Sequence, residues 1–166
     1  MPRGRANVFL IGFMGCGKSA VGRALARRLA LRFTDTDREI ERAQGLSVRR
    51  IFAERGEGAF RRLEARAVAR AARLGGIVAV GGGAATKKEN VSAMRARGTV
   101  VYLSASFPVL SARVKKNGAS ARPLWARARS LLARRRPLYR RAAHCTVRAG
   151  SGSPDEIAAR IARKLE

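Results

Sequence analysis

Short apolar runs and longer amphipathic stretches alternate along the chain, and the two patterns predict different elements. The runs at residues 8–11 and 77–80 are apolar enough to form buried strands. Five segments are predicted as strands: 8–11, 32–34, 77–80, 99–103 and 145–148. Between them, apolar residues recur at helical spacing, as Val21, Leu25 and Leu29 do at i, i+4 and i+8. Strands that alternate with helices predict a parallel sheet with helices on both faces.

Capping and breaking residues set the limits of the predicted helices. The helices are predicted at 19–30, 38–44, 51–55, 59–74, 90–97, 107–116, 126–142 and 154–166. Ser47 is the expected cap of the third helix, and Gly56 ends it. Pro137 is predicted to interrupt the seventh helix. Ser153 and Pro154 begin the last helix with a cap and a first-turn proline.

A chain of 166 residues suits a single domain that spans 1–166. Hydrophobic residues make up 46% of it, which is enough for a globular core. No apolar run approaches the ~20 residues that span a bilayer, and no secretory signal precedes the first strand. Cys16 and Cys145 fit a reduced protein rather than a disulfide framework or a metal site. We therefore expect a cytoplasmic protein that does not enter a membrane.

The net charge of +25, from 36 basic and 11 acidic residues, is the unusual feature of the composition. Such a charge attracts polyanions, so a nucleic-acid-binding protein is one interpretation. The arginines, however, recur along the polar faces of nearly every predicted helix, as Arg23, Arg27 and Arg28 do. Aromatic residues make up 5% of the chain, too few for extensive base stacking. The simpler interpretation is a solvated basic surface, with roles only for arginines in specific motifs.

The segment GFMGCGKS at residues 12–19 matches the pattern G-x-x-x-x-G-K-[ST], with a predicted strand before it and a helix after it. In this context glycines let the loop curl, so that backbone N–H groups point at phosphate oxygens. The start of the helix adds its positive dipole end. We expect Lys18 to reach the β- and γ-phosphates and Ser19 to bind Mg²⁺. A chance glycine-rich turn is the weaker alternative, and Cys16 is most simply a small filler.

Asp35, Thr36 and Asp37 follow the second predicted strand in a chain with few acids. If the segment is extended, alternation turns both carboxylates to the same side. One carboxylate could then hold Mg²⁺ through water, and the other could orient an acceptor hydroxyl. The alternative is structural, because Thr36 or Asp37 could simply cap the helix at 38–44. The pattern alone leaves both alternatives open.

Other candidate residues each have a structural alternative. Arg61 and Glu64 are three residues apart on one predicted helix, so they could pair in a site or on the surface. The three glycines at 81–83 could form a turn or let the backbone approach a ligand. Arg122 follows a stretch of small and polar residues and could belong to a mobile arm. The arginines at 134–136 could form only a charged helix face.

Taken together, GFMGCGKS, DTD, FRRLE, GGG, RPL and the arginine-x-PLY segment resemble the shikimate kinase family, in the family's order and over nearly the whole chain. The phosphate loop alone is widely shared, but the combination is specific. The resemblance implies a three-layer α/β sandwich of the P-loop kinase type, with a five-stranded parallel sheet flanked by helices. It also implies transfer of the γ-phosphoryl group of ATP to the 3-hydroxyl of shikimate, on the route to chorismate and the aromatic amino acids.

The resemblance also implies roles for individual residues. Catalytic roles fall on Lys18, Asp37 and Arg122, and the Mg²⁺ site falls on Ser19 and Asp35. The implied ATP site comprises Gly12, Gly15, Cys16, Gly17, Lys18, Ser19, Ala20, Arg113, Arg122 and Pro154. The implied shikimate site comprises Asp37, Arg61, Gly81, Gly82, Gly83 and Arg135. Two arginines suit this substrate because a guanidinium fork grips a carboxylate better than lysine does. Lys115 competes with Arg113 for the place beside adenine.

The resemblance further implies a monomer with a mobile lid around 115–127, and ATP and shikimate as partners, without specific nucleic acid. Trp125 departs from the family pattern, which usually has leucine there, and the segment from Trp125 to Arg135 is shorter than usual. Two other functions stay open. One is another small-molecule kinase of the same fold, such as a gluconate kinase, which need not keep Asp37, Arg61 and Arg135 together. The other is a basic nucleic-acid-binding protein on a kinase scaffold.

Overall fold

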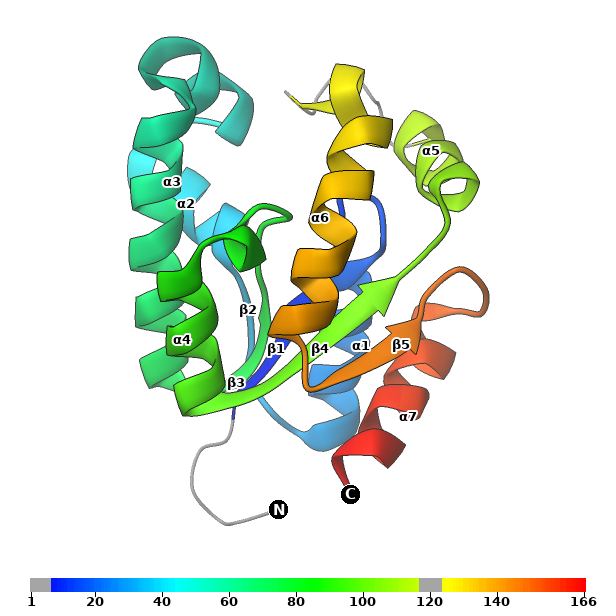
Figure 1. The fold of residues 1–166 in the computed structure, drawn as a ribbon. Coiled ribbons are helices and arrows are strands. Elements are labelled where there is room, and N and C mark those ends of the chain that lie inside the picture. Colours follow the sequence, from blue (N-terminus) through cyan, green and yellow to red (C-terminus); the bar gives the residue numbers. More distant parts are fainter. Residues whose placement is uncertain (1–6, 117–123) are drawn as a thin grey trace.

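Five parallel strands form the central sheet of this computed structural model, which describes residues 7–116 and 124–166 (Figure 1). The strands are β1 (Asn7–Ile11), β2 (Phe33–Asp35), β3 (Gly76–Ala79), β4 (Gly98–Ser104) and β5 (Cys145–Arg148). They lie side by side in the order β2-β3-β1-β4-β5, and each neighbouring pair is parallel. All residues of the central strand β1 are buried, as expected for a parallel strand covered on both faces.

Helices cover both faces of the sheet, which confirms the predicted three-layer architecture (Figure 1). They are α1 (Lys18–Leu29), α2 (Thr36–Gln44), α3 (Val48–Leu74), α4 (Lys88–Arg97), α5 (Phe107–Lys116), α6 (Ala128–Ala142) and α7 (Pro154–Leu165), with 3₁₀ turns η1 (Ala84–Thr86) and η3 (Trp125–Arg127). α1 and α7 pack against each other on one side of the sheet, and α4 and α6 lie on the other. None of the helices in the described part of the chain is long and apolar enough to cross a membrane.

The predicted caps and breaks are found close to their expected positions. Ser47 caps α3, because its side chain accepts a hydrogen bond from the backbone N–H of Arg50 at 3.2 Å. Gly56 interrupts α3 with non-helical φ 81° and ψ 168°, so the two helices predicted on either side of it are separated there by a kink. Ser153 and Glu156 form a reciprocal capping box at the start of α7. Local capping chemistry therefore sets these limits as the sequence indicated.

The predicted interruption at Pro137 is wrong, because α6 runs unbroken from Ala128 to Ala142. The helix also begins two residues later than predicted, after the η3 turn. A proline inside a helix removes one backbone hydrogen bond and costs about 3 kcal/mol. In α6 this cost is offset by tertiary packing, since Leu132 and Tyr139 on either side of the proline are buried.

The carboxyl ends of the strands meet at one edge of the sheet, and the sequence motifs follow them there. The phosphate loop, residues 12–17, continues β1, while Asp35 ends β2. The glycine segment, residues 81–83, follows β3. Because β3 and β4 pair with opposite sides of β1, the chain leaves β1 where the strand order reverses. Open α/β sheets bind ligands at such a point, so the fold itself positions a site beside the phosphate loop.

Candidate active site

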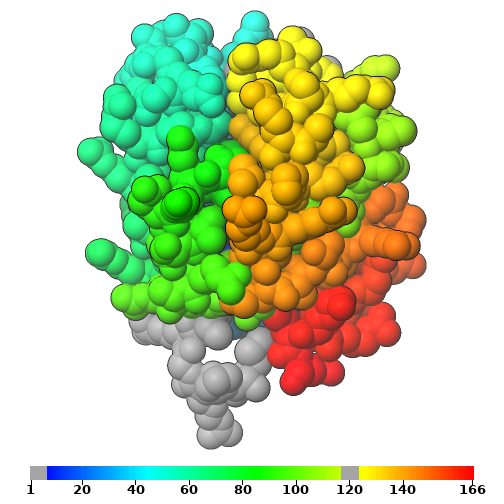
Figure 2. Space-filling model, viewed as in Figure 1, coloured from blue at the N-terminus to red at the C-terminus, as the bar shows by residue number. Residues whose placement is uncertain are grey.

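A cleft of about 850 Å³ opens at the carboxyl edge of the sheet. It brings together most of the residues singled out from the sequence. These are Gly15, Cys16, Gly17, Lys18, Ser19, Ala20, Asp35, Asp37, Arg61, Glu64, Gly81, Gly82, Gly83, Arg113, Arg135 and Pro154. On the face shown in Figure 2, α6 in yellow to orange stands beside α3 in teal, and both contribute walls to the cleft. Arg122 and most of the predicted lid fall at 117–123, outside the described residues.

Backbone geometry explains the glycines of the phosphate loop. Gly15 and Gly17 have φ 85° and 93°, in the left-handed region that favours glycine. A Cβ on Gly15 would also stand 2.8 Å from Cγ2 of Val114, so a side chain has neither a relaxed conformation nor space there. The loop therefore curls closely onto the N-terminus of α1. Free N–H groups and the helix dipole at such a terminus favour a phosphate group.

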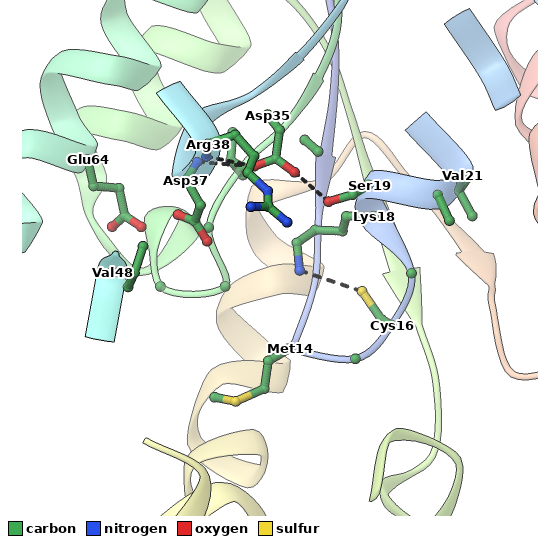
Figure 3. Close-up of a pocket in the computed structure, with 18 of the residues that line it drawn as sticks. Met14, Cys16, Lys18, Ser19, Val21, Asp35, Asp37, Arg38, Val48 and Glu64 are labelled. Atoms are coloured by element: carbon green, nitrogen blue, oxygen red, sulfur yellow. Dashed lines mark hydrogen bonds between the residues drawn. The ribbon is translucent and has the colours of Figure 1, made fainter. Parts of the chain in front are cut away.

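Lys18 is the first residue of α1, and its side chain returns over the phosphate loop (Figure 3). Its Nζ donates to the carbonyl oxygens of Gly12 at 2.8 Å and Phe13 at 3.1 Å, and it lies 3.7 Å from Sγ of Cys16. Gly12 thus contributes a carbonyl oxygen rather than a wall of the cleft. Cys16 is buried, which agrees with its interpretation as a small filler. The loop therefore holds one positive charge at its centre.

Ser19 and Asp35 form a short hydrogen bond beside the phosphate loop, with 2.5 Å between Oγ and Oδ2 (Figure 3). The other carboxylate oxygen of Asp35 accepts hydrogen bonds from the N–H groups of Asp37 and Arg38 at 3.1 and 3.3 Å. Asp35 is therefore the cap of α2, and neither Thr36 nor Asp37 is. Asp35 takes this role because it is the last extended residue before the helix. A hydroxyl and a carboxylate oxygen in contact fit Mg²⁺, which prefers oxygen ligands.

Asp37 lies in the first turn of α2, so the predicted extended alternation of the two carboxylates is wrong. Both carboxylates nevertheless line the cleft, because the turn of the helix carries Asp37 toward the glycine segment. A Cβ on Gly81 would stand 2.8 Å from Oδ1 of Asp37. In Figure 3 the carboxylates of Asp37 and Glu64 lie on one side of the cleft, and Lys18 and Ser19 lie on the other. The two aspartates therefore lie at different places in the cleft, with Asp35 beside Ser19 and Asp37 beside the glycine segment.

Arg61 and Glu64 pair on α3 at 2.8 Å, as their spacing predicted. This pair belongs to the cleft rather than to the solvated surface, since the Arg61 side chain is 13% exposed and Glu64 is fully buried. Burial raises the pKa of the Glu64 carboxyl, although the positive charges of Arg61 and Arg135 oppose this effect. Within the described residues, Oε2 of Glu64 has no hydrogen-bond partner. Arg61 also contacts Glu57 at 3.2 Å, so its guanidinium is held from two sides.

Only one of the three arginines at 134–136 lines the cleft, and it is Arg135, as predicted. It is 7% exposed, and a Cβ on Gly82 would lie 3.7 Å from its Nη1. On the opposite helix, the guanidinium of Arg61 lies so close to Gly83 that a Cβ there would overlap it. The fold thus brings both candidate carboxylate-binding arginines to the same glycine segment from α3 and α6.

Two residues whose role was not predicted from the sequence hold the glycine segment in place. The hydroxyl of Tyr139 donates to the carbonyl of Gly82 at 2.5 Å, and the N–H of Gly81 donates to Oγ1 of Thr36 at 3.2 Å. Thr36 and Tyr139 are both fully buried. They belong to the DTD and PLY motifs, but nothing in those motifs indicated their partners. Apolar residues that line the cleft were also missed, among them Met14, Val48, Phe52, Phe60 and Leu124.

At the other end of the cleft, Arg113 connects the phosphate loop with the chain after β5. Its guanidinium donates to the carbonyl of Ala149 at 2.7 Å and to that of Cys16 at 3.4 Å. Arg113 and Pro154 line the cleft, whereas Lys115 does not. The geometry therefore favours Arg113 over Lys115 as the basic residue on this side.

Comparison with known proteins identifies the family to which this arrangement belongs. Residues 14–166 match the family model described as shikimate kinase. The chain belongs to the shikimate kinase family. The shikimate kinase of Symbiobacterium thermophilum is 44% identical, with 96% of this chain and 96% of the relative covered. That of Ralstonia nicotianae is 42% identical, with 97% of this chain and 87% of the relative covered.

Solved structures agree with this assignment. Shikimate kinase from Acinetobacter baumannii, solved in complex with shikimate, has a TM-score of 0.91 and 36% identity, covering 96% of this chain and 92% of that one. Shikimate kinase from Aquifex aeolicus has a TM-score of 0.85 and 34% identity, covering 96% and 95%. A gluconokinase from Sinorhizobium meliloti has a TM-score of 0.59 and 19% identity, covering 97% and 95%, a likeness that concerns the fold alone. The P-loop kinase fold and the enzyme class predicted from the sequence are confirmed, and the two alternative functions are not favoured.

Proposed function

We propose that this shikimate kinase transfers the γ-phosphoryl group of ATP to the 3-hydroxyl of shikimate, giving shikimate 3-phosphate for chorismate and aromatic amino acid biosynthesis. The observation that carries the proposal is the convergence of the phosphate loop, Asp37, Arg61 and Arg135 on one cleft. A small anionic polyol needs such a set, with guanidinium groups for its carboxylate and a carboxylate for its hydroxyl. The shikimate-bound structure of the similar Acinetobacter baumannii enzyme supports this choice of substrate.

We propose that ATP occupies the half of the cleft between the phosphate loop and the start of α7. Backbone N–H groups of residues 12–20 would surround its phosphates. Lys18 would exchange the carbonyl oxygens of the loop for β- and γ-phosphate oxygens, which carry more negative charge. Arg113 and Pro154 would border the adenine ring, since both line that end of the cleft.

Ser19 and Asp35 are the proposed protein ligands of Mg²⁺. Their oxygens already lie 2.5 Å apart at the edge of the phosphate loop. Mg²⁺ takes few protein ligands in kinases, because phosphate oxygens and waters complete its shell. When bound, it would offset the negative charge that develops during transfer. Because Asp35 also caps α2, the same carboxylate would connect the metal site with the helix that carries Asp37.

Shikimate is proposed to lie between Asp37 and the two arginines. Arg61 and Arg135 would hold its carboxylate, and the backbone of the glycine segment would border its ring. Asp37 would orient the 3-hydroxyl and accept its proton while the oxygen bonds to the γ-phosphorus and the bond to the leaving oxygen of ADP breaks. Arg122, which lies outside the described residues, is proposed to add positive charge as the phosphoryl group transfers.

A coupled assay that follows ADP release tests the proposal directly, with shikimate, gluconate or no acceptor. We expect turnover that depends on shikimate, and a product heavier by one phosphoryl group. Turnover with gluconate and none with shikimate would contradict the assignment. Strongly salt-dependent DNA binding without any ATP turnover would instead favour a nucleic-acid-binding protein.

The remaining expectations stay predictions. They are a monomer in the cytoplasm, no nucleic-acid or membrane partner, and a lid around 115–127. Size-exclusion chromatography with light scattering would test the expected monomer, which has the mass of one 17.9 kDa chain.

A further inference from the structure

The glycine segment is fastened on both sides by buried hydroxyl groups. Thr36 of α2 accepts a hydrogen bond from the N–H of Gly81, and Tyr139 of α6 donates one to the carbonyl of Gly82. The second bond is the shorter, at 2.5 Å, and it crosses 57 residues of sequence. Both hydroxyl groups are inaccessible to water, so a lost bond would leave a buried polar group unsatisfied. The segment therefore has one defined position relative to α6.

Tyr139 lies one helical turn after Arg135, on the same face of α6. Pro137 stands between them, and it removes the backbone hydrogen bond that would otherwise reach back one turn along the helix. At this point α6 is therefore held less by its own backbone and more by side-chain contacts. The contact of Tyr139 with Gly82 is one such anchor (Figure 1 shows α6 beside the loop that follows β3).

Arg135 is close to both partners of this hydrogen bond. Its Nη1 lies 3.7 Å from the position that a Cβ on Gly82 would occupy. Burial raises the pKa of the Tyr139 phenol, and the nearby positive charge of Arg135 opposes that rise. The phenol remains neutral around neutral pH, so its hydroxyl stays a hydrogen-bond donor. One cluster thus joins an arginine of the proposed shikimate site, a backbone carbonyl of the same site and a buried hydroxyl.

We infer that the hydroxyl of Tyr139 is a positioning group for the shikimate site, because it holds the glycine segment at a fixed distance from Arg135. The inference rests on the proposed function, in which both elements contact shikimate. Tyr139 would touch no substrate atom and would act through Gly82 and Arg135. Without the hydroxyl, the segment and α6 can shift apart, and the carboxylate of shikimate loses its aligned partners. ATP binding depends on the opposite half of the cleft and should be spared.

The chain supplies a matched control for this role. Tyr102 of β4 is also buried, and its ring lies 5.2 Å from that of Tyr139 between centroids. Burial raises the pKa of its phenol too, but the largest opposing effect comes from the charge of Arg136. Arg136 does not line the cleft. Removing either hydroxyl deletes one oxygen from the same ring pair, but only that of Tyr139 touches the glycine segment.

Calorimetric titration of the wild type, Tyr139→Phe and Tyr102→Phe with shikimate and with ATP tests the inference. In Tyr139→Phe we expect the Kd of shikimate to rise roughly tenfold, as for the loss of one buried hydrogen bond, while the Kd of ATP changes by less than about twofold. The KM of shikimate should rise in parallel, with kcat at saturation nearly kept. Tyr102→Phe should leave all of these values within about twofold.

Three results would overturn the inference: an unchanged shikimate Kd in Tyr139→Phe, equal weakening in both variants, or equal weakening of shikimate and ATP. The last two would indicate general loosening of the fold. A wild type that binds no shikimate would instead contradict the proposed function, so the two failures are distinguishable.

A second measurement does not require Tyr139→Phe to fold. The chain has 2 tyrosines, so Tyr102→Phe grown with 3-fluorotyrosine carries a single fluorine label at Tyr139. We expect its ¹⁹F resonance to shift as shikimate is added, with the same Kd as calorimetry gives. A resonance that does not move at saturating shikimate would contradict a coupling between Tyr139 and the site.

Discussion

The two halves of the cleft are built in different ways. In the phosphate half, the loop that would surround the phosphates is one continuous stretch, residues 12–19, in which each residue has its place because of the backbone conformation of its neighbours. The acceptor half comes from four separate elements, with Asp37 on α2, Arg61 on α3, the glycine segment after β3, and Arg135 on α6. Its geometry depends on contacts between residues that are far apart in sequence, such as the bond between Tyr139 and Gly82.

This difference has a consequence for function. A local loop keeps its shape when distant side chains change, because its glycine conformations and helix terminus are intrinsic to it. In a site assembled from several elements, each residue that fixes the spacing of those elements also affects the geometry of the site. Substitutions in the phosphate half should therefore affect the transfer step whatever the acceptor. Substitutions in the acceptor half should separate shikimate binding from ATP binding.

The largest expected effect is that of removing the positive charge of Lys18 from the phosphate half. Lys18→Met should lower kcat by roughly 10³–10⁵-fold, the range for loss of a cation that stabilises a transferring phosphoryl group. The fold should persist, because the hydrogen bonds of Lys18 stay within the phosphate loop, to the carbonyl oxygens of Gly12 and Phe13 and to Sγ of Cys16. A coupled assay and circular dichroism would measure the two effects. Arg28→Met, an exposed substitution on the same helix, is the control. Near-normal turnover of Lys18→Met would contradict the role proposed for Lys18 in phosphoryl transfer.

Asp37→Asn should lower kcat by roughly 10²–10⁴-fold, because the amide keeps the shape but cannot accept the proton of the hydroxyl. ATP affinity should survive, since Asp37 faces the acceptor half. Glu39→Gln, which changes a surface carboxylate on the same helix paired with Arg42, is the matched control. Nucleotide titration and steady-state kinetics would separate the effects. If ATP affinity collapsed while shikimate affinity held, the roles of Asp35 and Asp37 would have to be exchanged.

Arg135→Ala should weaken shikimate binding roughly 10²-fold, the usual cost of losing one partner of a desolvated charge pair, and should leave ATP binding nearly unchanged. Arg136→Ala on the same helix is the control, because Arg136 lies outside the cleft. Arg135 gives a cleaner test than Arg61, whose loss would also leave the buried Glu64 without its ion-pair partner.

Arg122→Ala should instead depress kcat more than shikimate binding. A loss of shikimate affinity with an unchanged kcat at saturating substrate would contradict the assignment of Arg122 to the lid.

The smallest effect should come from a site that belongs to neither half. Nδ1 of His144 accepts a hydrogen bond from the N–H of Val100 at 2.9 Å, near the start of β4. Burial, together with the charge of Arg95, lowers the pKa of His144 below its usual value near 6.5. The folded state therefore prefers the neutral ring, and the stability that this contributes is present above pH ~6.5 and lost as pH falls through the folded pKa.

Thermal unfolding of the wild type and His144→Asn at pH 7.5 and pH 5 would measure this contribution. The wild type should lose about 1 °C more in Tm than the variant, which keeps an acceptor but does not titrate. Affinities for ATP and shikimate should differ little between the two proteins at either pH. A loss of substrate affinity in His144→Asn would show that the two halves of the cleft are not independent of the rest of the sheet.

Features that depend on consecutive residues could be read from the sequence. The strand and helix pattern, the phosphate loop, the cap at Ser47 and the break at Gly56 were all predicted, and the structure has them. Each follows from backbone conformation or from a hydrogen bond within a few residues. The pair of Arg61 and Glu64 is of the same kind, because helical spacing alone brings three-apart side chains together.

Other features could not be read from the chain because they depend on remote partners. The continuity of α6 through Pro137 and the anchoring of the glycine segment by Thr36 and Tyr139 required the packed fold. In each case a local rule offered several outcomes. Burial selected one of them, since a polar group away from water must find a partner and an apolar face must find a neighbour.

The residues along the chain were enough to predict a phosphate-binding loop and a resemblance to the shikimate kinases. The glycines of the phosphate loop have backbone conformations that other residues rarely adopt. The order of the remaining motifs is given directly by the amino-acid sequence. The way in which Asp37, Arg61, Arg135 and the glycine segment face one another depends instead on the packed fold. Their distances are set by the packing of α2, α3 and α6 at the carboxyl edge of the sheet, and that packing is a property of the whole buried core rather than of any segment.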